Sequence, residues 1–262
     1  MGDPVKKANL GVVEQFTLAT AAAMVNMIIV HPIDQVKIRR QVLRYPYTSS
    51  SSGKVYSNTT LGVFRQLCDE GFVGMTSGLG ANLAIYFSSA IMKYFPGGTV
   101  TSYFKASDKK SSYILSLLSK VFSGAIGGAL SLSVTTPLIR SRIVSALPPD
   151  SSVAPVTFYG LFSGFGTACS GIVVYRGVYF ILYDLMSSAI LTSGYLTKFL
   201  FGYSVTTVAG LAAYPFDTIR SVQMVNCCTA SKAISIIHKH PHGLWEGYMG
   251  GWKESILRGL IG

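Results

Sequence analysis

Three short stretches of the sequence decide the fold. They read HPIDQVK at residues 31–37, TPLIRSR at residues 136–142 and YPFDTIR at residues 214–220. Each follows an apolar block, has proline at its second position and carries a basic residue five positions after that proline. The first and third stretches also have aspartate two positions after the proline. A unit that recurs in this way predicts a parallel threefold repeat.

Six apolar blocks are spaced along the chain, and the three stretches follow the first, third and fifth of them. The blocks cover about residues 10–30, 79–95, 113–136, 166–190, 196–214 and 252–262. Two helices per repeat predict an all-α membrane protein with six transmembrane helices. We divide the chain into three repeats at residues 1–105, 106–190 and 191–262. The last block makes only about 16 Å of helix, so we expect its helix to begin earlier, near Leu244, or the C-terminus to be incomplete.

The composition also points to a membrane protein. Of the 262 residues, 49% are hydrophobic and 13% are charged, whereas about 25% of the residues of a soluble domain are charged. The net charge of +11 would suggest nucleic-acid binding in a soluble protein. Here the basic residues are scattered between apolar blocks, with no basic run and no aromatic stacking platform. We therefore expect no nucleic-acid partner, and assign the basic excess to lipid head groups or an anionic substrate.

Patterns typical of enzymes, metal sites and cofactor sites are missing from the sequence. There is no Walker A sequence, no recognisable catalytic triad and no C-x-x-C pair among the four cysteines. His238, His240 and His242 alternate in a segment that contains Pro241, which we interpret as a solvated loop. We expect neither catalysis nor a bound metal or cofactor.

The three prolines, Pro32, Pro137 and Pro215, are expected to kink their helices, because proline removes one backbone hydrogen bond. Aspartate and base three residues apart share one helix face. Charged groups at the end of a transmembrane helix must face water or partners on other helices, so an acid from one helix could pair with a base from the next. The alternative is that each proline ends its helix and the charges sit at the water interface. The threefold recurrence favours the ring of ion pairs.

At these positions the sequence resembles the mitochondrial carrier family, whose motif Pro-x-[Asp/Glu]-x-x-[Lys/Arg] occurs once per repeat. Glu70-Gly71 and the stretch GLWEG at residues 243–247 are similar to the family's acidic-glycine segment. The resemblance implies a six-helix bundle with threefold pseudosymmetry and short matrix-side helices, which works as a monomer by alternating access. It places the protein in the inner membrane of a mitochondrion, mitosome or hydrogenosome, in contact with membrane lipid, including cardiolipin.

Three further stretches resemble the adenine-nucleotide branch of that family, the ADP/ATP carriers. They are GIVVYRGVYF at residues 171–180, VAGL at residues 208–211 and LRG at residues 257–259. The implied activity is antiport of ADP and ATP or a related anion. The resemblance assigns a base-binding surface and two cavity cations to five residues: Gly171, Ile172, Tyr175, Arg176 and Arg258.

The resemblance also implies a gate on the matrix side, with Asp34 paired to Arg142 and Asp217 paired to Lys37. Its members are the charged residues of the three stretches and a bracing glutamine: Asp34, Lys37, Gln41, Arg142, Asp217 and Arg220. Ile139 stands where the second stretch should carry an acid. We therefore expect Arg220 to lack its usual partner.

Several departures from the ADP/ATP carriers leave the cargo open. Met27 and Ile85 stand where those carriers have cavity cations, and RSVQMV at residues 220–225 replaces their Arg-Arg-Arg-Met-Met-Met run. The family also has a gate on the intermembrane side, with the motif [Phe/Tyr]-[Asp/Glu]-x-x-[Arg/Lys]. On the fourth block, Tyr183-Asp184 matches the start of this motif, but Ser187 stands in place of its basic residue. Two alternatives therefore remain: a carrier of another phosphorylated or carboxylate anion, and a degenerate carrier that serves as a scaffold.

Overall fold

The computed structural model describes residues 12–42, 59–94, 113–147, 157–190, 194–239 and 244–261, and this part of the chain is helical without a strand. Its helices are α1 Val12–Val42, α2 Thr60–Asp69, α3 Gly71–Thr76, α4 Leu79–Tyr94, α6 Tyr113–Ala146, α7 Phe158–Leu161, α8 Phe165–Ile190, α9 Tyr195–Asn226, α10 Ala230–His238, α11 Leu244–Tyr248 and α12 Trp252–Ile261.

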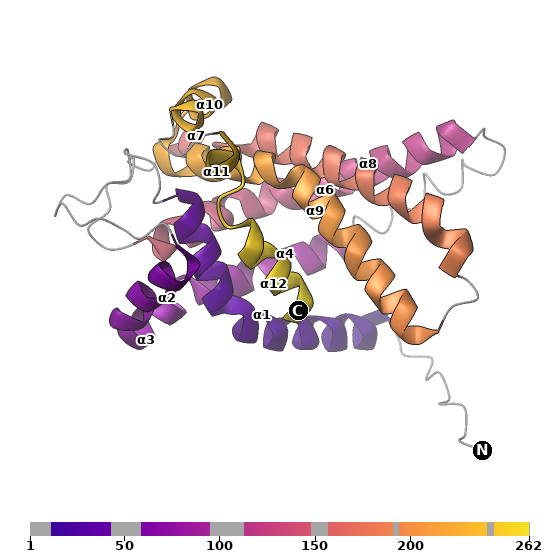
Figure 1. Cartoon of the computed structure of the whole chain (residues 1–262), viewed down its shortest axis with the longest axis horizontal. Coiled ribbons are helices and arrows are strands. Elements are labelled where there is room, and N and C mark those ends of the chain that lie inside the picture. The colour runs from indigo at the N-terminus through magenta and orange to yellow at the C-terminus, as the bar shows by residue number, and fades with distance from the viewer. Residues whose placement is uncertain are drawn as a thin grey trace, which may run out of the picture.

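Six of these helices form a closed ring. In chain order α1 packs against α4, α4 against α6, α6 against α8, α8 against α9 and α9 against α12, while α12 returns to α1. The short helices α2, α3, α7, α10 and α11 gather at one end of this bundle (Figure 1). Within the described residues, Phe16–Val42, Phe165–Leu185 and Tyr195–Asn226 are long and apolar enough to cross a membrane. The described residues thus form a ring of six packed helices, of which α1, α8 and α9 contain the stretches long and apolar enough to span.

The helices that contain the three prolines continue beyond them. Pro32, Pro137 and Pro215 lie inside α1, α6 and α9, and each helix runs on for about three more turns of 3.6 residues. The alternative in which proline ends the helix is wrong, and so are the predicted ends of these blocks. The segments beyond the prolines carry buried apolar residues such as Val36 and Met224, whose packing outweighs the one lost hydrogen bond. Figure 1 shows the bend in α1.

A glycine with positive φ directly precedes three helices of the ring, α4, α8 and α12. Gly78 (φ 74°), Gly164 (φ 83°) and Gly251 (φ 88°) lie directly before α4, α8 and α12. A Cβ atom on these glycines would lie 3.3, 3.2 and 3.2 Å from the carbonyl oxygens of Arg142, Arg220 and Lys37, respectively. These are the three bases that follow the prolines by five residues. Each repeat thus packs on the next, and the third packs on the first.

The first short helix, α2, has one buried face and one exposed face. Thr59 caps its N-terminus by accepting a hydrogen bond from the backbone N–H of Gly62. Val63 and Leu67 are its buried face and pack against Val36 of α1. Phe64 is 41% exposed, although the spacing of three residues places it on the same side of the helix as Leu67.

The last helix begins at Trp252, where its apolar block begins, and the alternative of a start near Leu244 is wrong. Leu244 belongs to a separate helix, α11, and α12 begins only at Trp252. The break lies at Gly251, whose positive φ does not continue an α-helix. The Ser-rich segment 47–58, the residues after Tyr94 on the second block, and His240 and His242 lie outside the described residues. The repeat boundaries also fall there, and we retain them as a proposal.

Candidate functional site

The ion pair between Asp34 and Arg142 joins α1 to α6. Arg142 Nη2 lies 2.8 Å from Asp34 Oδ2. The side chain of Asp34 is 3% exposed and that of Arg142 is 16% exposed. The two residues are 108 positions apart in the chain, and they meet because α1 and α6 bring their post-proline faces to the same axis. The pairing expected from the sequence is formed.

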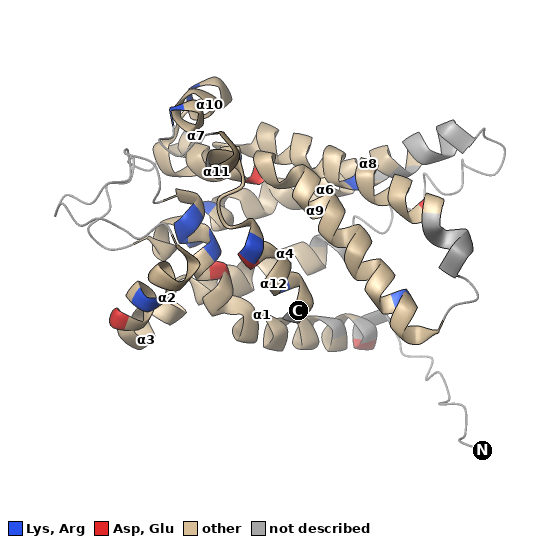
Figure 2. Ribbon diagram, in the orientation of Figure 1, with Lys and Arg blue, Asp and Glu red and all other residues tan. Residues whose placement is uncertain are grey.

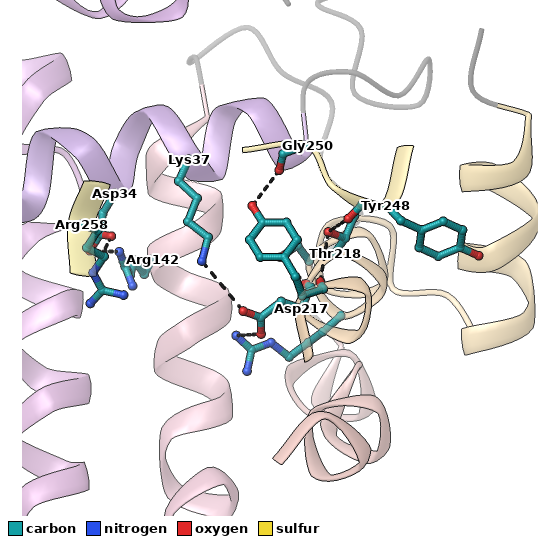
Figure 3. Close-up of polar contacts among 11 residues, drawn as sticks. Asp34, Lys37, Arg142, Asp217, Thr218, Tyr248, Gly250 and Arg258 are labelled. Carbon is teal, nitrogen blue, oxygen red and sulfur yellow. Dashed lines mark hydrogen bonds and ion pairs between the residues drawn. The ribbon is translucent and has the colours of Figure 1, made fainter. Parts of the chain in front are cut away.

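The second expected pair, Lys37 with Asp217, joins α1 to α9 (Figure 3). Lys37 Nζ lies 3.9 Å from Asp217 Oδ2 and 5.1 Å from the centroid of the Tyr214 ring, a geometry that adds a cation–π attraction. Arg220 Nη2 lies 3.4 Å from the other oxygen of Asp217, three residues earlier in the same helix. Arg220 thus pairs within its own helix and, as expected, has no acid at position 139 of α6 to pair with.

A third cation, Arg258 of α12, reaches the same group. Its Nε atom lies 2.9 Å from Asp34 Oδ1, so one carboxylate holds two arginines from two other helices. Figure 3 shows Asp34, Arg142 and Arg258 converging while Lys37 points toward Asp217. The sequence assigned Arg258 to the substrate only, because its contact with Asp34 depends on where the break at Gly251 places α12.

Together these six residues carry four positive and two negative charges, and we name them the gate cluster: Asp34, Lys37, Arg142, Asp217, Arg220 and Arg258. At the position of the missing third acid, Ile139 packs against an apolar group that includes Ile143 and Met224. The contact between α6 and α9 is therefore apolar, whereas ion pairs join α1 to α6 and α1 to α9. The cluster keeps an excess of two positive charges in a half-buried place, which attracts anions.

A cavity of about 350 Å³ opens beside the gate cluster. Its walls come from α1, α4, α8, α9 and α12 and include Asn26, Met27, Asp34, Tyr86, Tyr175 and Arg258. This volume is within the range of small-molecule sites. Among the lining residues that the structure describes, Arg258 is the one with a cationic side chain. The cavity thus combines aromatic walls with a guanidinium that is 39% exposed.

The five residues assigned to substrate by resemblance do not all reach this cavity. Tyr175 and Arg258 line it. A Cβ on Gly171 would lie 3.1 Å from Cβ of Phe216, so this glycine lets α8 approach α9 closely. Ile172 and Arg176 lie against two glycines of α6. An atom of Ile172 lies 3.0 Å from a Cβ placed on Gly128, and an atom of Arg176 lies 3.3 Å from a Cβ placed on Gly124.

The bracing glutamine, Gln41, is buried at 4% exposure beyond the gate cluster on α1. Near it the hydroxyl of Tyr214 donates a hydrogen bond to the carbonyl of Gly250 at 2.7 Å, and the hydroxyl of Thr218 donates to the carbonyl of Tyr248 at 2.6 Å. These bonds hold the segment between α11 and α12 on α9, which fixes the start of α12 and hence Arg258.

Two further ion pairs support the gate and were missed by sequence reasoning. Arg39 binds Glu70 through two contacts of 2.7 and 2.6 Å and donates from Nε to the carbonyl of Ala146 at 2.8 Å. Arg40 Nη1 lies 2.6 Å from the buried carboxylate of Glu254. The bases at residues 39 and 40, directly after HPIDQVK, were the signal that could have suggested these pairs. Figure 2 shows charges concentrated at this end of the bundle, whereas long stretches of α6, α8 and α9 have none.

The described residues contain no group of three or more histidine, cysteine or acidic side chains that could hold a metal ion. Their chemistry at the gate and cavity is that of ion pairing and aromatic contact. A ring of apolar helices, three with internal proline, around a cavity with charges at its base is the architecture of a membrane transport protein.

Comparisons with known proteins agree with this class. A family model described as mitochondrial carrier protein matches residues 8–106. The ADP/ATP translocase of Thermothelomyces thermophilus is 28% identical, with 95% of this chain and 88% of the translocase aligned. The ADP,ATP carrier protein of Kluyveromyces lactis is 29% identical over 100% of this chain and 93% of the carrier. ADP,ATP carrier protein ER-ANT1 of Arabidopsis thaliana is 28% identical over 85% of this chain and 80% of that protein.

The family match and these relatives support a divergent mitochondrial carrier. The same similarities indicate a multipass protein of the mitochondrial inner membrane, and the described residues form an all-α membrane fold. The family consists of transporters, which agrees with a site made of ion pairs and aromatic side chains.

Proposed function

We propose that this carrier exchanges adenine nucleotides, ADP for ATP, across the inner membrane by alternating access. The observation that supports this most is the position of Arg258, which lies on the cavity wall and in the gate cluster at once. A phosphate group is the natural ligand of a guanidinium, which can donate two parallel hydrogen bonds. The excess of two positive charges in the gate cluster would favour a multiply charged anion over a neutral solute.

Tyr175 supplies the second half of the proposed site. Tyr175 of α8 lines the same cavity as Arg258 of α12. Stacking on an aromatic ring stabilises a bound base by about 1–3 kcal/mol. Gly171, Ile172 and Arg176 flank Tyr175 and remain part of the proposal, as residues that the nucleotide would meet when α8 separates from α6 and α9.

The gate cluster would close the matrix side of the cavity. The pairs of Asp34 with Arg142 and of Lys37 with Asp217 tie α1 to α6 and α9, and Gln41 and Arg220 belong to the same closed end. Opening to the matrix requires these contacts to break, at a cost that substrate binding offsets in the transition between states. We propose that the protein does this as a monomer, with inner-membrane lipid such as cardiolipin around its short helices.

Transport by purified protein in liposomes tests this function. Wild-type protein should exchange labelled ADP, and Arg258→Ala should reduce the exchange at least about tenfold because the phosphate loses a charged hydrogen-bond donor. Lys253→Ala is the matched control, since Lys253 is on the same helix but lies over the ring of Trp252 and outside the cavity lining. Equal effects of the two substitutions would contradict the proposed site.

A second candidate keeps the mechanism and changes the cargo to another phosphorylated or carboxylate anion. Its support is the cavity lining, in which Met27 is apolar and Arg258 is the one cationic side chain among the described residues. Desolvating a triphosphate costs more free energy than desolvating a small anion with one charged group. A single guanidinium offsets the cost for the small anion better than the cost for the triphosphate. Competition of unlabelled nucleotides, phosphate and carboxylates against labelled substrate separates the two candidates. If no anion on such a panel exchanges, the chain is the scaffold that the incomplete motifs suggest.

A further inference from the structure

A second motif recurs three times, at the end of the bundle that carries the short helices. It reads FVGMTSG at residues 72–78, FYGLFSG at residues 158–164 and WEGYMGG at residues 245–251. In each copy an aromatic residue comes first, a glycine follows two positions later, and the glycine with positive φ before α4, α8 or α12 comes last. The aromatic residues lie on the short helices α3, α7 and α11 (Figure 1).

The aromatic residue that begins each copy is strongly exposed. Phe72 is 80% exposed, Phe158 is 73% exposed and Trp245 is 69% exposed. Exposed apolar neighbours, Val73 and Leu244, enlarge the surface at two of the three places. Apolar surface that is exposed in this way marks contact with a partner or with a membrane.

The three aromatic residues lie at one level along the axis of the bundle. Each is six positions before its glycine of positive φ, and these glycines contact the backbone of three bases in the same way: Arg142, Arg220 and Lys37. One contact that recurs three times around a closed ring of helices defines an approximate threefold axis. Because the helices of the ring cross the membrane, this axis runs along the membrane normal, and residues related by it lie at the same depth.

We infer that Phe72, Phe158 and Trp245 are anchors that insert into the boundary between the lipid head groups and the acyl chains. A flat lipid surface perpendicular to the axis meets three equivalent points at once. One protein partner that docked on the side of the bundle would cover only one of them. Tryptophan is enriched at membrane–water interfaces, and phenylalanine is typical of the apolar face of helices that lie in them. The inference does not depend on the cargo.

The surroundings of the anchors fit a lipid surface. Val173 and Ile181 are exposed within the apolar stretch of α8 that is long enough to span, so the anchors continue a surface that acyl chains cover. Lys232 and Lys239 are exposed on α10, which packs on α11 beside Trp245, and lysines at this level attract anionic head groups. The anchors therefore hold the end of the bundle that contains the gate cluster at a fixed depth.

Fluorescence quenching measures this depth directly. The chain contains two tryptophans, so Trp252→Phe leaves Trp245 as the one emitter. The variant is reconstituted into liposomes whose lipids carry bromine, a collisional quencher, either near the head group or near the bilayer centre. Trp245 should lose more emission to the shallow bromines, because interfacial side chains lie only about 5–10 Å below the surface. Iodide on both sides of the membrane should quench it less than it quenches free tryptophan.

The other two anchors are tested by moving the emitter. Phe72→Trp and Phe158→Trp, each in a background without Trp245 and Trp252, should show the same preference for the shallow bromines. Val173→Trp in that background is the matched control. Val173 lies about 14 Å along α8 from its first turn, so this variant should lose most emission to the deep bromines.

Several outcomes would overturn the inference. They are stronger quenching of Trp245 by the deep bromines and quenching by iodide as complete as for free tryptophan. Protection from iodide without loss to either bromolipid would show that a protein surface, such as a second copy of the chain, covers the side chain. A shallow profile at Trp245 alone would refute the threefold arrangement. If Trp252→Phe does not fold, the difference in emission between the wild type and Trp245→Phe isolates the same residue.

Discussion

The carbonyl oxygen of Lys37 lies 3.2 Å from the point at which a Cβ atom on Gly251 would stand. Gly251 precedes α12 in the third repeat and Lys37 belongs to the first, so this contact closes the ring of helices. The same relationship joins Gly78 to Arg142 and Gly164 to Arg220. Each contact places the start of α4, α8 or α12 against the backbone of the basic residue that follows a proline by five positions. The contacts therefore hold the backbone at these basic residues in place.

Substitution of Gly251 by alanine should destabilise the protein by about 1–3 kcal/mol, because the residue has positive φ and its new methyl group would press on the Lys37 carbonyl. Thermal unfolding in detergent measures the loss. Gly202→Ala on α9 is the control, since a Cβ there meets nothing within 4 Å. That variant should be as stable as the wild type or slightly more stable. A similar loss in both variants would show that the contact with Lys37 has no special weight.

The bidentate pair of Arg39 and Glu70 should contribute substantially to stability. Arg39 is 2% exposed, so Glu70→Gln leaves a buried guanidinium without its counter-charge and should cost about 2 kcal/mol. The control is Asp69→Asn, which removes an exposed acid from the neighbouring position. Calorimetric or fluorescence-detected unfolding distinguishes them. Equal stability of Glu70→Gln and Asp69→Asn would mean that this pair does not hold the end of α1.

Introducing an acid at the apolar side of the gate should slow transport. By the symmetry of the repeats, Ile139→Asp places a carboxylate where Arg220 could pair with it across α6 and α9. An added interhelical ion pair of this kind should reduce the exchange rate by roughly two- to fivefold. Ile139→Asn has nearly the same shape without the charge and controls for the lost apolar packing. The slowing should disappear in an Arg220→Ala background, and its persistence there would rule out the new pair.

Tyr175 should contribute to binding of the nucleobase of ADP and not to binding of its phosphates. Tyr175→Ala removes a stacking surface and should raise KM for ADP by about five- to a hundredfold, whereas Tyr175→Phe keeps the ring and should change it little. Tyr183→Ala, on the same helix and outside the cavity lining, serves as the comparison. Initial exchange rates against ADP concentration give the values. A KM for inorganic phosphate that changed as much as the KM for ADP would contradict stacking on the base.

The sequence predicts the fold well because its main signal is repeated. One proline with charges after it has several explanations, but three copies after alternate apolar blocks favour a common axis with ion pairs between helices. The specific pairs, Asp34 with Arg142 and Lys37 with Asp217, were implied by the resemblance to the carrier family. Helix ends are harder to predict. Hydropathy falls at the charged residues beyond Pro32, and only tertiary packing shows that α1 continues to Val42.

The site is predicted less completely than the gate. The contact of Arg258 with Asp34 depends on the break before α12, which is set by the conformation of Gly251 and by the bond from Tyr214 to Gly250. The positions of Ile172 and Arg176 depend on how far α8 rotates against α6, and no pattern along one helix encodes this rotation. Resemblance names these residues, but only coordinates show that in this arrangement they rest on glycines of α6.

The central claim is that a positively charged gate beneath this cavity admits an anion only in exchange for another. Its most direct test is the uptake of labelled ADP by liposomes that contain the purified protein and either internal ADP or none. We predict saturable uptake into ADP-loaded liposomes and little uptake into empty ones. Equal uptake into both, or none into either across a panel of nucleotides, phosphate and carboxylates, would contradict the account.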